Sequence, residues 1–172
     1  MVKYWICKGM IIMKFLNELK IVLTDCDGVL TDGGMYYYNN GVEGKKFNTR
    51  DGMAMKILKA NGIKTGIITG ENTKIVENRA NKLKIDYLYM GVKNKYQILL
   101  EICEKENITP NNAAYIGDDI NDLEILKNVG FSACPNDAME EVKKICNFVS
   151  SKDGGKGVVR DVIERYLSDN EW

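Results

Sequence analysis

The sequence predicts an α/β fold in which a doubly wound parallel sheet carries helices on both faces. Short apolar runs alternate with amphipathic stretches along nearly the whole chain, as expected of parallel strands joined by helices. The 172 residues are of the size of one domain. No linker, repeat or low-complexity segment interrupts the pattern. We therefore expect a single compact unit of this class.

The strands are predicted from apolar runs that are too short to be helices. They lie at residues 21–24, 65–69, 87–89, 113–116, 131–133 and 147–149. Between them, apolar residues recur at three- and four-residue spacing, which is typical of amphipathic helices. These helical stretches cover residues 53–60, 73–83, 96–106, 123–127 and 138–144. Clustered glycines at residues 154–157 predict a turn.

One segment breaks the alternation and predicts a β-hairpin flap at about residues 34–47. Residues 35–38 and 42–47 flank the sequence Asn39-Asn40-Gly41, and Asn-Gly is a strong hairpin-turn signal. The hairpin directly follows the first strand, so we expect it at the carboxyl edge of the sheet. Ligands bind at that edge in doubly wound folds.

Composition narrows the classes of function. Lys and Arg total 24, as do Asp and Glu, and a formal net charge of zero argues against a nucleic-acid partner. The chain has no histidine, which excludes the common histidine-based catalytic and zinc sites. Its five cysteines are scattered and form no CxxC pair. We therefore expect buried thiols and a reducing, cytoplasmic location.

The first 13 residues predict an N-terminal extension to a single domain over residues 14–172. Their apolar pieces are interrupted by Lys8 and followed by Lys14, and they fall far short of the roughly 20 apolar residues that span a bilayer. No small-residue cleavage site follows, so we expect neither a signal peptide nor a membrane partner. Our hypothesis is that the extension is dispensable for folding.

The strongest chemical signal lies directly after the first strand. Asp25 and Asp27 are two residues apart, and in an extended chain such side chains point the same way. Gly28 lets the chain turn sharply behind them. An acidic loop that merely caps a strand is the plainer alternative.

A second acidic run, Gly117–Asp122, follows the strand at residues 113–116. Carboxylates gathered at one edge repel one another unless a cation neutralises them. Oxygen ligands without histidine suit Mg²⁺. The alternative for Asp118 and Asp119 is the capping of a helix N-terminus.

Two further residues complete a predicted phosphate site. Thr69 ends another strand and, with Gly70, offers a hydroxyl group and backbone N–H groups. Lys95 opens a helix after the third strand. A cation and a lysine together reduce the repulsion between an attacking carboxylate and an anionic phosphate.

Together these four segments resemble the haloacid dehalogenase-like phosphatases. The resemblance rests on the order of DxDGxxT at Asp25–Thr31, Thr69, Lys95, and GDDxxD at Gly117–Asp122. The short interval between Thr31 and Thr69 leaves no room for a cap domain. The chain therefore looks like a cap-less member, similar to the 3-deoxy-manno-octulosonate 8-phosphate phosphatases and their relatives acting on nine-carbon sugar acid 9-phosphates.

The resemblance implies a role for each matching residue. Asp25 would be the nucleophile that forms an aspartyl-phosphate, and Asp27 would act as general acid and then as general base. Thr69 and Lys95 would hold phosphoryl oxygens. Mg²⁺ would be held by the Asp25 carboxylate, the backbone carbonyl of Asp27, and Asp118. Further carboxylates would stand behind these ligands: Asp119 and Asp122.

The same resemblance implies a sugar acid phosphate as substrate. Its contacts would come from the start of the first helix, Asn48, Thr49, Arg50, Asp51 and Gly52, and from Lys56 and Arg79. Arginine suits a sugar carboxylate because guanidinium groups bind carboxylates bidentately. The hairpins would pack a homotetramer in which a neighbouring subunit closes the site. A glycine-rich C-terminal segment would also reach towards an active site.

One departure bears on the substrate. The octulosonate enzymes usually carry Arg after Thr-Gly, whereas this chain has Glu71 after Gly70. The chain looks more like the nine-carbon relatives, which have Thr-Gly-Glu at this position and a Lys at the position of Lys82. The sequence therefore favours a nine-carbon, sialic-type (KDN) 9-phosphate, with the eight-carbon 8-phosphate as the alternative. A non-catalytic oligomerisation domain and a phospho-receiver module are further alternatives.

Overall fold

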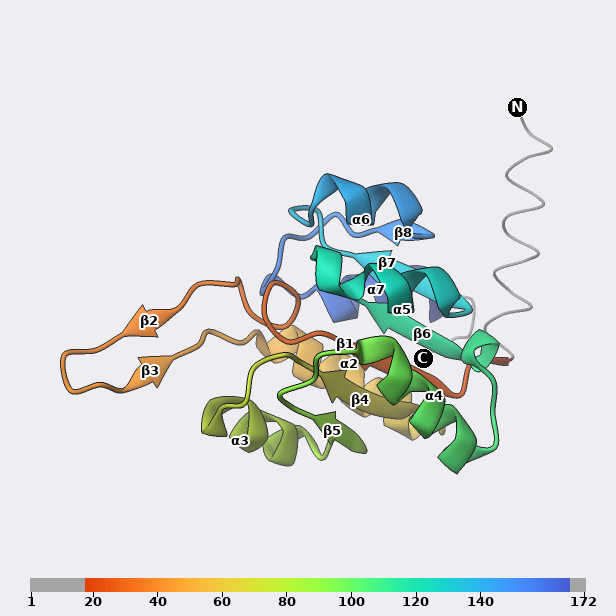
Figure 1. The fold of residues 1–172 in the computed structure, drawn as a ribbon, viewed down its shortest axis with the longest axis horizontal. Coiled ribbons are helices and arrows are strands. Elements are labelled where there is room, and N and C mark those ends of the chain that lie inside the picture. The colour runs from red at the N-terminus through yellow and green to blue at the C-terminus, as the bar shows by residue number, and fades with distance from the viewer. Residues whose placement is uncertain (1–17, 168–172) are drawn as a thin grey trace.

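The computed structural model describes residues 18–167, which form a six-stranded parallel sheet flanked by helices (Figure 1). The sheet order is β5-β4-β1-β6-β7-β8. Its strands are β1 (Ile21–Thr24), β4 (Lys64–Ile68), β5 (Tyr87–Tyr89), β6 (Ala113–Ile116), β7 (Phe131–Cys134) and β8 (Phe148–Val149). The predicted fold class is confirmed. The proposed extension at residues 1–13 lies outside the described residues.

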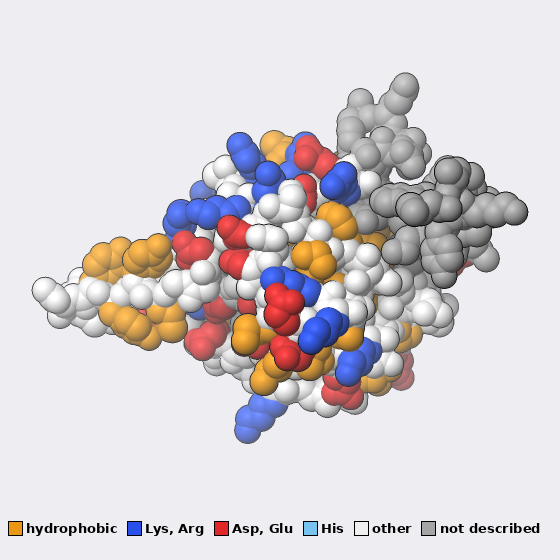
Figure 2. All heavy atoms as spheres, turned by 90° about the horizontal axis from the view of Figure 1, so that it is seen from above, with side chains coloured by type: hydrophobic (Ala, Val, Ile, Leu, Met, Phe, Trp, Pro, Cys, Tyr) orange, Lys and Arg blue, Asp and Glu red, His pale blue; other side chains and the backbone are white. Residues whose placement is uncertain are grey.

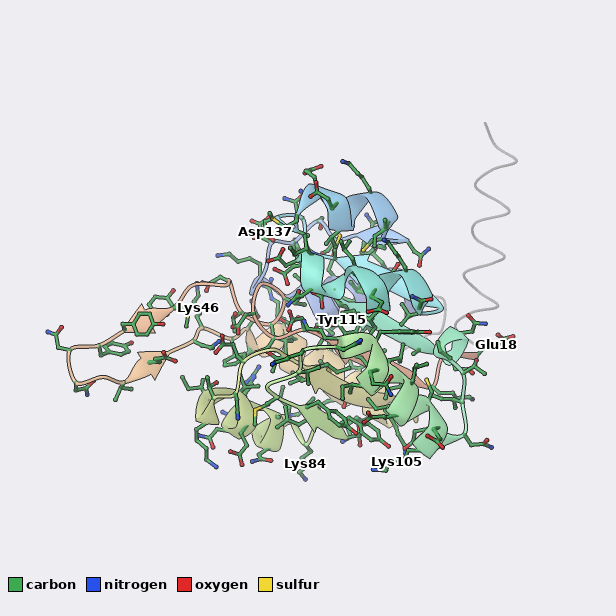
Figure 3. All side chains as sticks on the ribbon, viewed as in Figure 1. Glu18, Lys46, Lys84, Lys105, Tyr115 and Asp137 are labelled. Carbon is green, nitrogen blue, oxygen red and sulfur yellow. The ribbon has the colours of Figure 1, made fainter. Side chains whose placement is uncertain are left out.

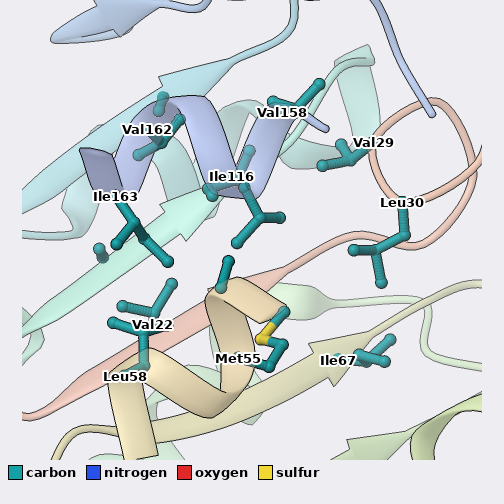
Figure 4. Packing of buried hydrophobic residues seen from close by; sticks show 14 of the residues in the cluster. Val22, Val29, Leu30, Met55, Leu58, Ile67, Ile116, Val158, Val162 and Ile163 are labelled. Carbon is teal, nitrogen blue, oxygen red and sulfur yellow. The ribbon is translucent and has the colours of Figure 1, made fainter. Parts of the chain in front are cut away.

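Side chains alternate along each strand, so the buried strands present apolar side chains on both faces of the sheet. Helices cover both faces. Val22 of β1 belongs to one buried apolar cluster, and its neighbours Ile21 and Leu23 belong to another. The first cluster includes side chains of α2 (Thr49–Ala60), α3 (Lys74–Leu83) and α7 (Val158–Leu167), and Figure 4 shows part of it. The second includes side chains of α4 (Lys95–Glu106), α5 (Leu123–Asn128) and α6 (Glu140–Ile145).

The strand order reverses beside β1. The chain proceeds from β1 to β4 and β5 on one side, and then from β6 to β7 and β8 on the other. Thr24 at the end of β1 pairs in register with Ile67 of β4 and with Ile116 of β6. The segments that follow these three strands therefore meet at the switch point, where doubly wound folds bind ligands.

The predicted hairpin is present and projects from the body of the fold (Figure 1). Strands β2 (Tyr36–Tyr37) and β3 (Glu43–Gly44) pair antiparallel, and Gly41 takes the positive φ of +79° that the turn requires. Several large apolar side chains on it are exposed, which Figure 2 shows at the projecting end: Met35, Tyr36, Tyr37, Tyr38 and Val42.

Two elements differ from the sequence prediction. Helix α2 begins at Thr49 rather than at residue 53, because Asn48 caps it by accepting a hydrogen bond from the backbone N–H of Arg50 at 3.0 Å. Helix α7 follows the glycine-rich turn and was not predicted. Its buried positions include Val158 and Val162, four residues apart, a spacing that could have revealed it.

The predicted glycine-rich turn at residues 154–157 is present. Two short 3₁₀ helices lie in the connections between other elements. They are η1 (Pro110–Asn112) and η2 (Ile120–Asp122), and η2 leads directly into α5. In the part of the chain from residue 18 to residue 167, none of the helices has the length and apolar character needed to cross a membrane.

Candidate active site

The loop after β1 carries the two aspartates predicted to do the chemistry. Asp25 is buried, with 6% of its surface exposed, and its backbone N–H donates to the carbonyl of Ile116 in β6 at 2.9 Å. Gly28 has a φ of +80°, the sharp turn that the sequence predicts. The Asp25 and Asp27 side chains have different partners: Asp25 is paired with Lys95, and Asp27 with Lys45.

Lys95 links the two acidic segments. It is the first residue of α4, it is 3% exposed, and its Nζ lies 2.8 Å from Oδ2 of Asp25 and 2.7 Å from Oδ1 of Asp122. The Tyr115 hydroxyl, from the centre of β6 (Figure 3), donates to the same oxygen of Asp122 at 2.7 Å. The backbone N–H of Asp118 donates to the other oxygen at 3.1 Å. Asp122 therefore holds Lys95 and Tyr115 with one oxygen and the backbone of Asp118 with the other. Its place behind the metal ligands stays a prediction.

Three carboxylates gather tightly enough to hold a cation. One oxygen from each of Asp25, Asp118 and Asp122 lies within 4.8 Å of the others. Among the described residues, the buried Oδ1 of Asp118 has no hydrogen-bond partner. A Cβ at Gly28 would lie 1.9 Å from Oδ2 of Asp118, so only glycine leaves room for that carboxylate. This all-oxygen donor set fits Mg²⁺.

The ionisation of these groups reflects their crowding. Burial, and then the charge of Asp122, raise the pKa of Asp25 to about 6, against the opposing effect of Lys95. Burial, Asp25 and Asp122 raise the pKa of Asp118 to about 8. Burial alone lowers the pKa of Lys95, but the two carboxylates reverse this and raise it. A divalent cation would relieve the repulsion that holds a proton on the acidic cluster.

Asp27 is held by two residues from the ends of the hairpin. The Thr31 hydroxyl donates to Oδ1 at 3.0 Å, and Nζ of Lys45 lies 2.5 Å from Oδ2. Thr31 and Phe47 form an isolated antiparallel bridge that closes the base of the hairpin. The sequence analysis missed Lys45 as a site residue. The signal that could have found it is the hairpin itself, which must return to the edge where it began.

Thr69 lies at the same edge, one residue beyond β4. It is buried, and its backbone N–H donates to the carbonyl of Tyr89 at 3.0 Å. Its hydroxyl accepts from the backbone N–H of Glu71 at 3.2 Å. Gly70 and Glu71 are exposed. Because β1 and β4 are neighbours, Asp25 and Thr69 follow adjacent strands at the same edge of the sheet.

The residues predicted to contact the sugar fall into two groups. Arg79 is half-buried, donates to the carbonyl of Asn48 at 2.8 Å, and lies over the ring of Phe47. Gly52 is buried beneath it, where a Cβ would approach the guanidinium to 3.3 Å. The exposed group consists of Thr49, Arg50, Lys56 and Lys82.

Asp51 has a structural partner that the sequence analysis did not foresee. Its carboxylate is 1% exposed and accepts a hydrogen bond from the backbone N–H of Arg160, at the start of α7, at 3.2 Å. Burial raises the pKa of Asp51 to about 6, against the opposing effect of the backbone N–H groups of Arg160 and Val159. This contact joins α7 to α2 and accounts for one carboxylate oxygen. Its role as a substrate contact stays a prediction.

The capping alternative holds for Asp119. Its Oδ1 accepts from the backbone N–H of Ile120 at 2.7 Å, at the start of η2, and the residue is exposed. Its place behind the metal ligands therefore stays a prediction. Asp118, by contrast, points into the carboxylate cluster.

The glycine-rich C-terminal segment packs against the loop that follows β1 in its own chain. A Cβ on Gly154 would lie 2.2 Å from the carbonyl oxygen of Gly28. The backbone N–H of Gly155 donates to the carbonyl of Val29 at 3.0 Å, and the Asn48 side chain donates to the carbonyl of Gly155 at 3.1 Å. This segment therefore joins the start of α2 to the loop that follows β1.

Comparisons with known proteins agree with this geometry. The family model of haloacid dehalogenase-like hydrolases matches residues 46–130. The 3-deoxy-D-manno-octulosonate 8-phosphate phosphatase KdsC of Escherichia coli is 38% identical over 156 residues, which cover 91% of this chain and 83% of the relative. This chain belongs to the KdsC-type phosphatase family.

Solved structures of KdsC-type proteins share the whole fold. The enzyme from Moraxella catarrhalis, in complex with magnesium, phosphate and KDO, superimposes with a TM-score of 0.88 at 34% identity, covering 93% of this chain and 91% of that one. A cobalt-bound enzyme from Haemophilus influenzae gives 0.85 at 34% identity, with 90% of each chain covered. The predictions of a cap-less phosphatase and of a Mg²⁺ cofactor are confirmed at the level of the family.

These relatives do not support the predicted preference for a nine-carbon substrate. The KdsC-type proteins compared above carry the eight-carbon activity in their names. The preference predicted from Glu71 and Lys82 is therefore less well supported than its eight-carbon alternative. The receiver and scaffold alternatives are likewise not supported, because KdsC-type proteins are phosphomonoester hydrolases.

Proposed function

We propose that this KdsC-type chain is a Mg²⁺-dependent phosphatase that removes the terminal phosphate of 3-deoxy-D-manno-octulosonate 8-phosphate. The observation that carries the proposal is the buried Lys95 between Asp25 and Asp122, together with the buried Oδ1 of Asp118, which has no hydrogen-bond partner in residues 18–167. The names of the relatives support the substrate. The residue roles below are those that the resemblance to the haloacid dehalogenase-like phosphatases implies.

In the first step a carboxylate oxygen of Asp25 attacks phosphorus, and the bond from phosphorus to the sugar oxygen breaks. Asp27 gives its proton to the departing oxygen, which leaves as the sugar hydroxyl. Lys95 and Thr69 hold phosphoryl oxygens and offset their charge. Asp25, Asp118 and the backbone carbonyl of Asp27 would hold Mg²⁺, whose positive charge would offset the repulsion between the Asp25 carboxylate and the phosphate.

In the second step a water molecule attacks the phosphorus of the aspartyl-phosphate. Asp27, now a carboxylate, takes a proton from this water. The bond from phosphorus to the Asp25 oxygen breaks, which releases phosphate and restores the nucleophile. One residue thus serves as acid and then as base, so its carboxylate must stay correctly placed through both steps.

We also infer that the chain assembles as a homotetramer through its hairpins. The exposed apolar side chains of residues 35–42 support this, because monomers rarely expose such a patch on a projecting element. The resemblance further implies that a neighbouring subunit closes each site. The cytoplasmic location stays a prediction.

The proposal is tested by measuring phosphate release, with Mg²⁺, from the eight-carbon 8-phosphate and the nine-carbon 9-phosphate side by side. We expect turnover that EDTA abolishes and a higher kcat/KM for the eight-carbon substrate. A clear nine-carbon preference would keep the mechanism and overturn the substrate. Full activity in EDTA would contradict the metal dependence.

A further inference from the structure

Lys45 is a buried cation for which the two-step mechanism above has no use. It lies one residue beyond β3, on the leg of the hairpin that returns to the sheet, and its side chain is 2% exposed. Its ammonium lies 2.5 Å from Oδ2 of Asp27. Burying an ammonium group is costly unless a partner compensates for the lost water. The Asp27 carboxylate is such a partner.

The contact fixes both oxygens of one carboxylate from opposite legs of the hairpin. Thr31, on the outgoing leg, donates to Oδ1 of Asp27, and Lys45, on the returning leg, donates to Oδ2. The bridge between Thr31 and Phe47 joins the legs at that level. With one bond alone, the carboxylate could still rotate. Two hydrogen bonds, from hairpin legs that are joined to each other, fix the plane of the carboxylate.

We propose that Lys45 is a positioning residue that holds the Asp27 carboxylate in the orientation needed for proton transfer to and from the substrate. The inference rests on the proposed function, in which Asp27 is the acid and base. A carboxylate oxygen can accept more than one hydrogen bond, so the oxygen held by Lys45 can still exchange a proton with a reacting oxygen. The hairpin thereby gains a role within its own subunit.

The adjacent Lys46 provides a matched control. Its side chain is 58% exposed, and its Nζ lies 3.7 Å from Oδ2 of Asp32, in an exposed ion pair. Figure 3 labels it where the hairpin joins the body of the fold. Lys46 shares the hairpin leg and charge of Lys45 but does not contact Asp27, so replacing it tests for general effects on the hairpin.

The test is a double-mutant cycle with Lys45→Met, Asp27→Asn and the double variant, assayed on the eight-carbon phosphate with Mg²⁺. We expect Lys45→Met to lower kcat by about 10- to 100-fold, because small misplacements of a reacting group cost this much, with KM within about twofold. In the Asp27→Asn background the same change should alter kcat by less than about twofold. Lys46→Met should leave kcat within about twofold.

Equal fold-losses in both backgrounds would overturn the inference, since Lys45 would then act independently of Asp27. A change confined to KM would do the same, because it would make Lys45 a substrate contact. Thermal unfolding of each variant checks the fold, and if Lys45→Met fails to fold, the cycle is run with Lys45→Gln. Absence of turnover of any phosphate ester by the unaltered chain would instead overturn the proposed function.

Discussion

The ammonium nitrogen of Lys95 lies 2.8 Å from Oδ2 of Asp25, and both side chains are buried at the switch point of the sheet. Lys95 also contacts Asp122, so one cation serves two carboxylates. This arrangement leaves the Asp25 carboxylate partly neutralised yet able to approach a phosphate. In the proposed mechanism, this contact joins the nucleophile to a group that binds the phosphate.

Asp25→Asn tests this assignment. An amide cannot form the aspartyl-phosphate, so kcat should fall by at least about 10³-fold. The fold should remain, because the substitution removes a charge that burial and Asp122 already disfavour. Phosphate release and thermal unfolding, measured on the same preparation, check both statements. Turnover that persists in a folded variant would contradict the assignment of Asp25 as the nucleophile.

The acidic cluster predicts an unusual dependence of stability on pH without metal. The pKa of Asp118 is raised to about 8 and that of Asp25 to about 6, both from an ordinary value of 3.8. Between about pH 4 and pH 8 the folded chain therefore binds more protons than the unfolded chain. Stability should fall as pH rises through this window. In EDTA, the unfolding midpoint should be lower at pH 8 than at pH 5.

Magnesium should reverse this trend, because it binds the ionised carboxylates. The increase in unfolding midpoint on adding Mg²⁺ should be larger at pH 8 than at pH 5. Asp118→Asn is the control variant, since it removes one titrating group and one ligand. It should give a shallower pH slope in EDTA and a smaller Mg²⁺ effect. An unchanged slope would show that Asp118 does not carry the linkage.

Most of the site was predictable because strand ends determine it. Apolar runs before Asp25, Thr69 and Gly117 identify neighbouring strands, and parallel strands bring their carboxyl ends to one edge. Lys95 follows β5, the strand beyond β4, and reaches the same edge from the start of α4.

What the sequence did not reveal depends on contacts between distant segments. Lys45 reaches Asp27 because the hairpin folds back on Thr31. The Asn-Gly turn predicts that return, but no local pattern shows which side chain of the returning leg meets Asp27. The carboxylate of Asp51 is directed inwards by α7, more than a hundred residues along the chain. Helix α7 itself was missed because glycines precede it and the sequence analysis predicted only a turn there.

The exposed hairpin predicts an assembly interface that a single charge should disrupt. Tyr37 is 67% exposed near the hairpin tip, so Tyr37→Asp should leave the fold intact but shift the proposed tetramer towards smaller species. Size-exclusion chromatography with light scattering measures this directly. Leu100→Asp, an equal change at an exposed position on α4, should leave the tetramer intact. An unaltered chain that runs as a monomer would contradict the proposed assembly.

Glu71 provides the sharpest test of how the site distinguishes its sugar. It is exposed, two residues after Thr69, and its backbone N–H donates to the Thr69 hydroxyl at 3.2 Å. Replacing it with Arg reverses the charge that an anionic sugar acid meets at this position. Glu71→Arg should shift the ratio of kcat/KM values towards the eight-carbon substrate by about fivefold, the size of an exposed charge interaction of about 1 kcal/mol.

The same charge reversal at Glu101, which is exposed on α4, should leave the ratio of kcat/KM values unchanged and thus controls for net charge. Both substrates are assayed in one buffer, since exposed charges are screened by salt. If Glu71→Arg and Glu101→Arg both give the same ratio of kcat/KM values as the unaltered chain, Glu71 does not contribute to discrimination between the two sugars. Discrimination between the two sugars would then have to come from other predicted substrate contacts, such as Arg79, which lies over the ring of Phe47.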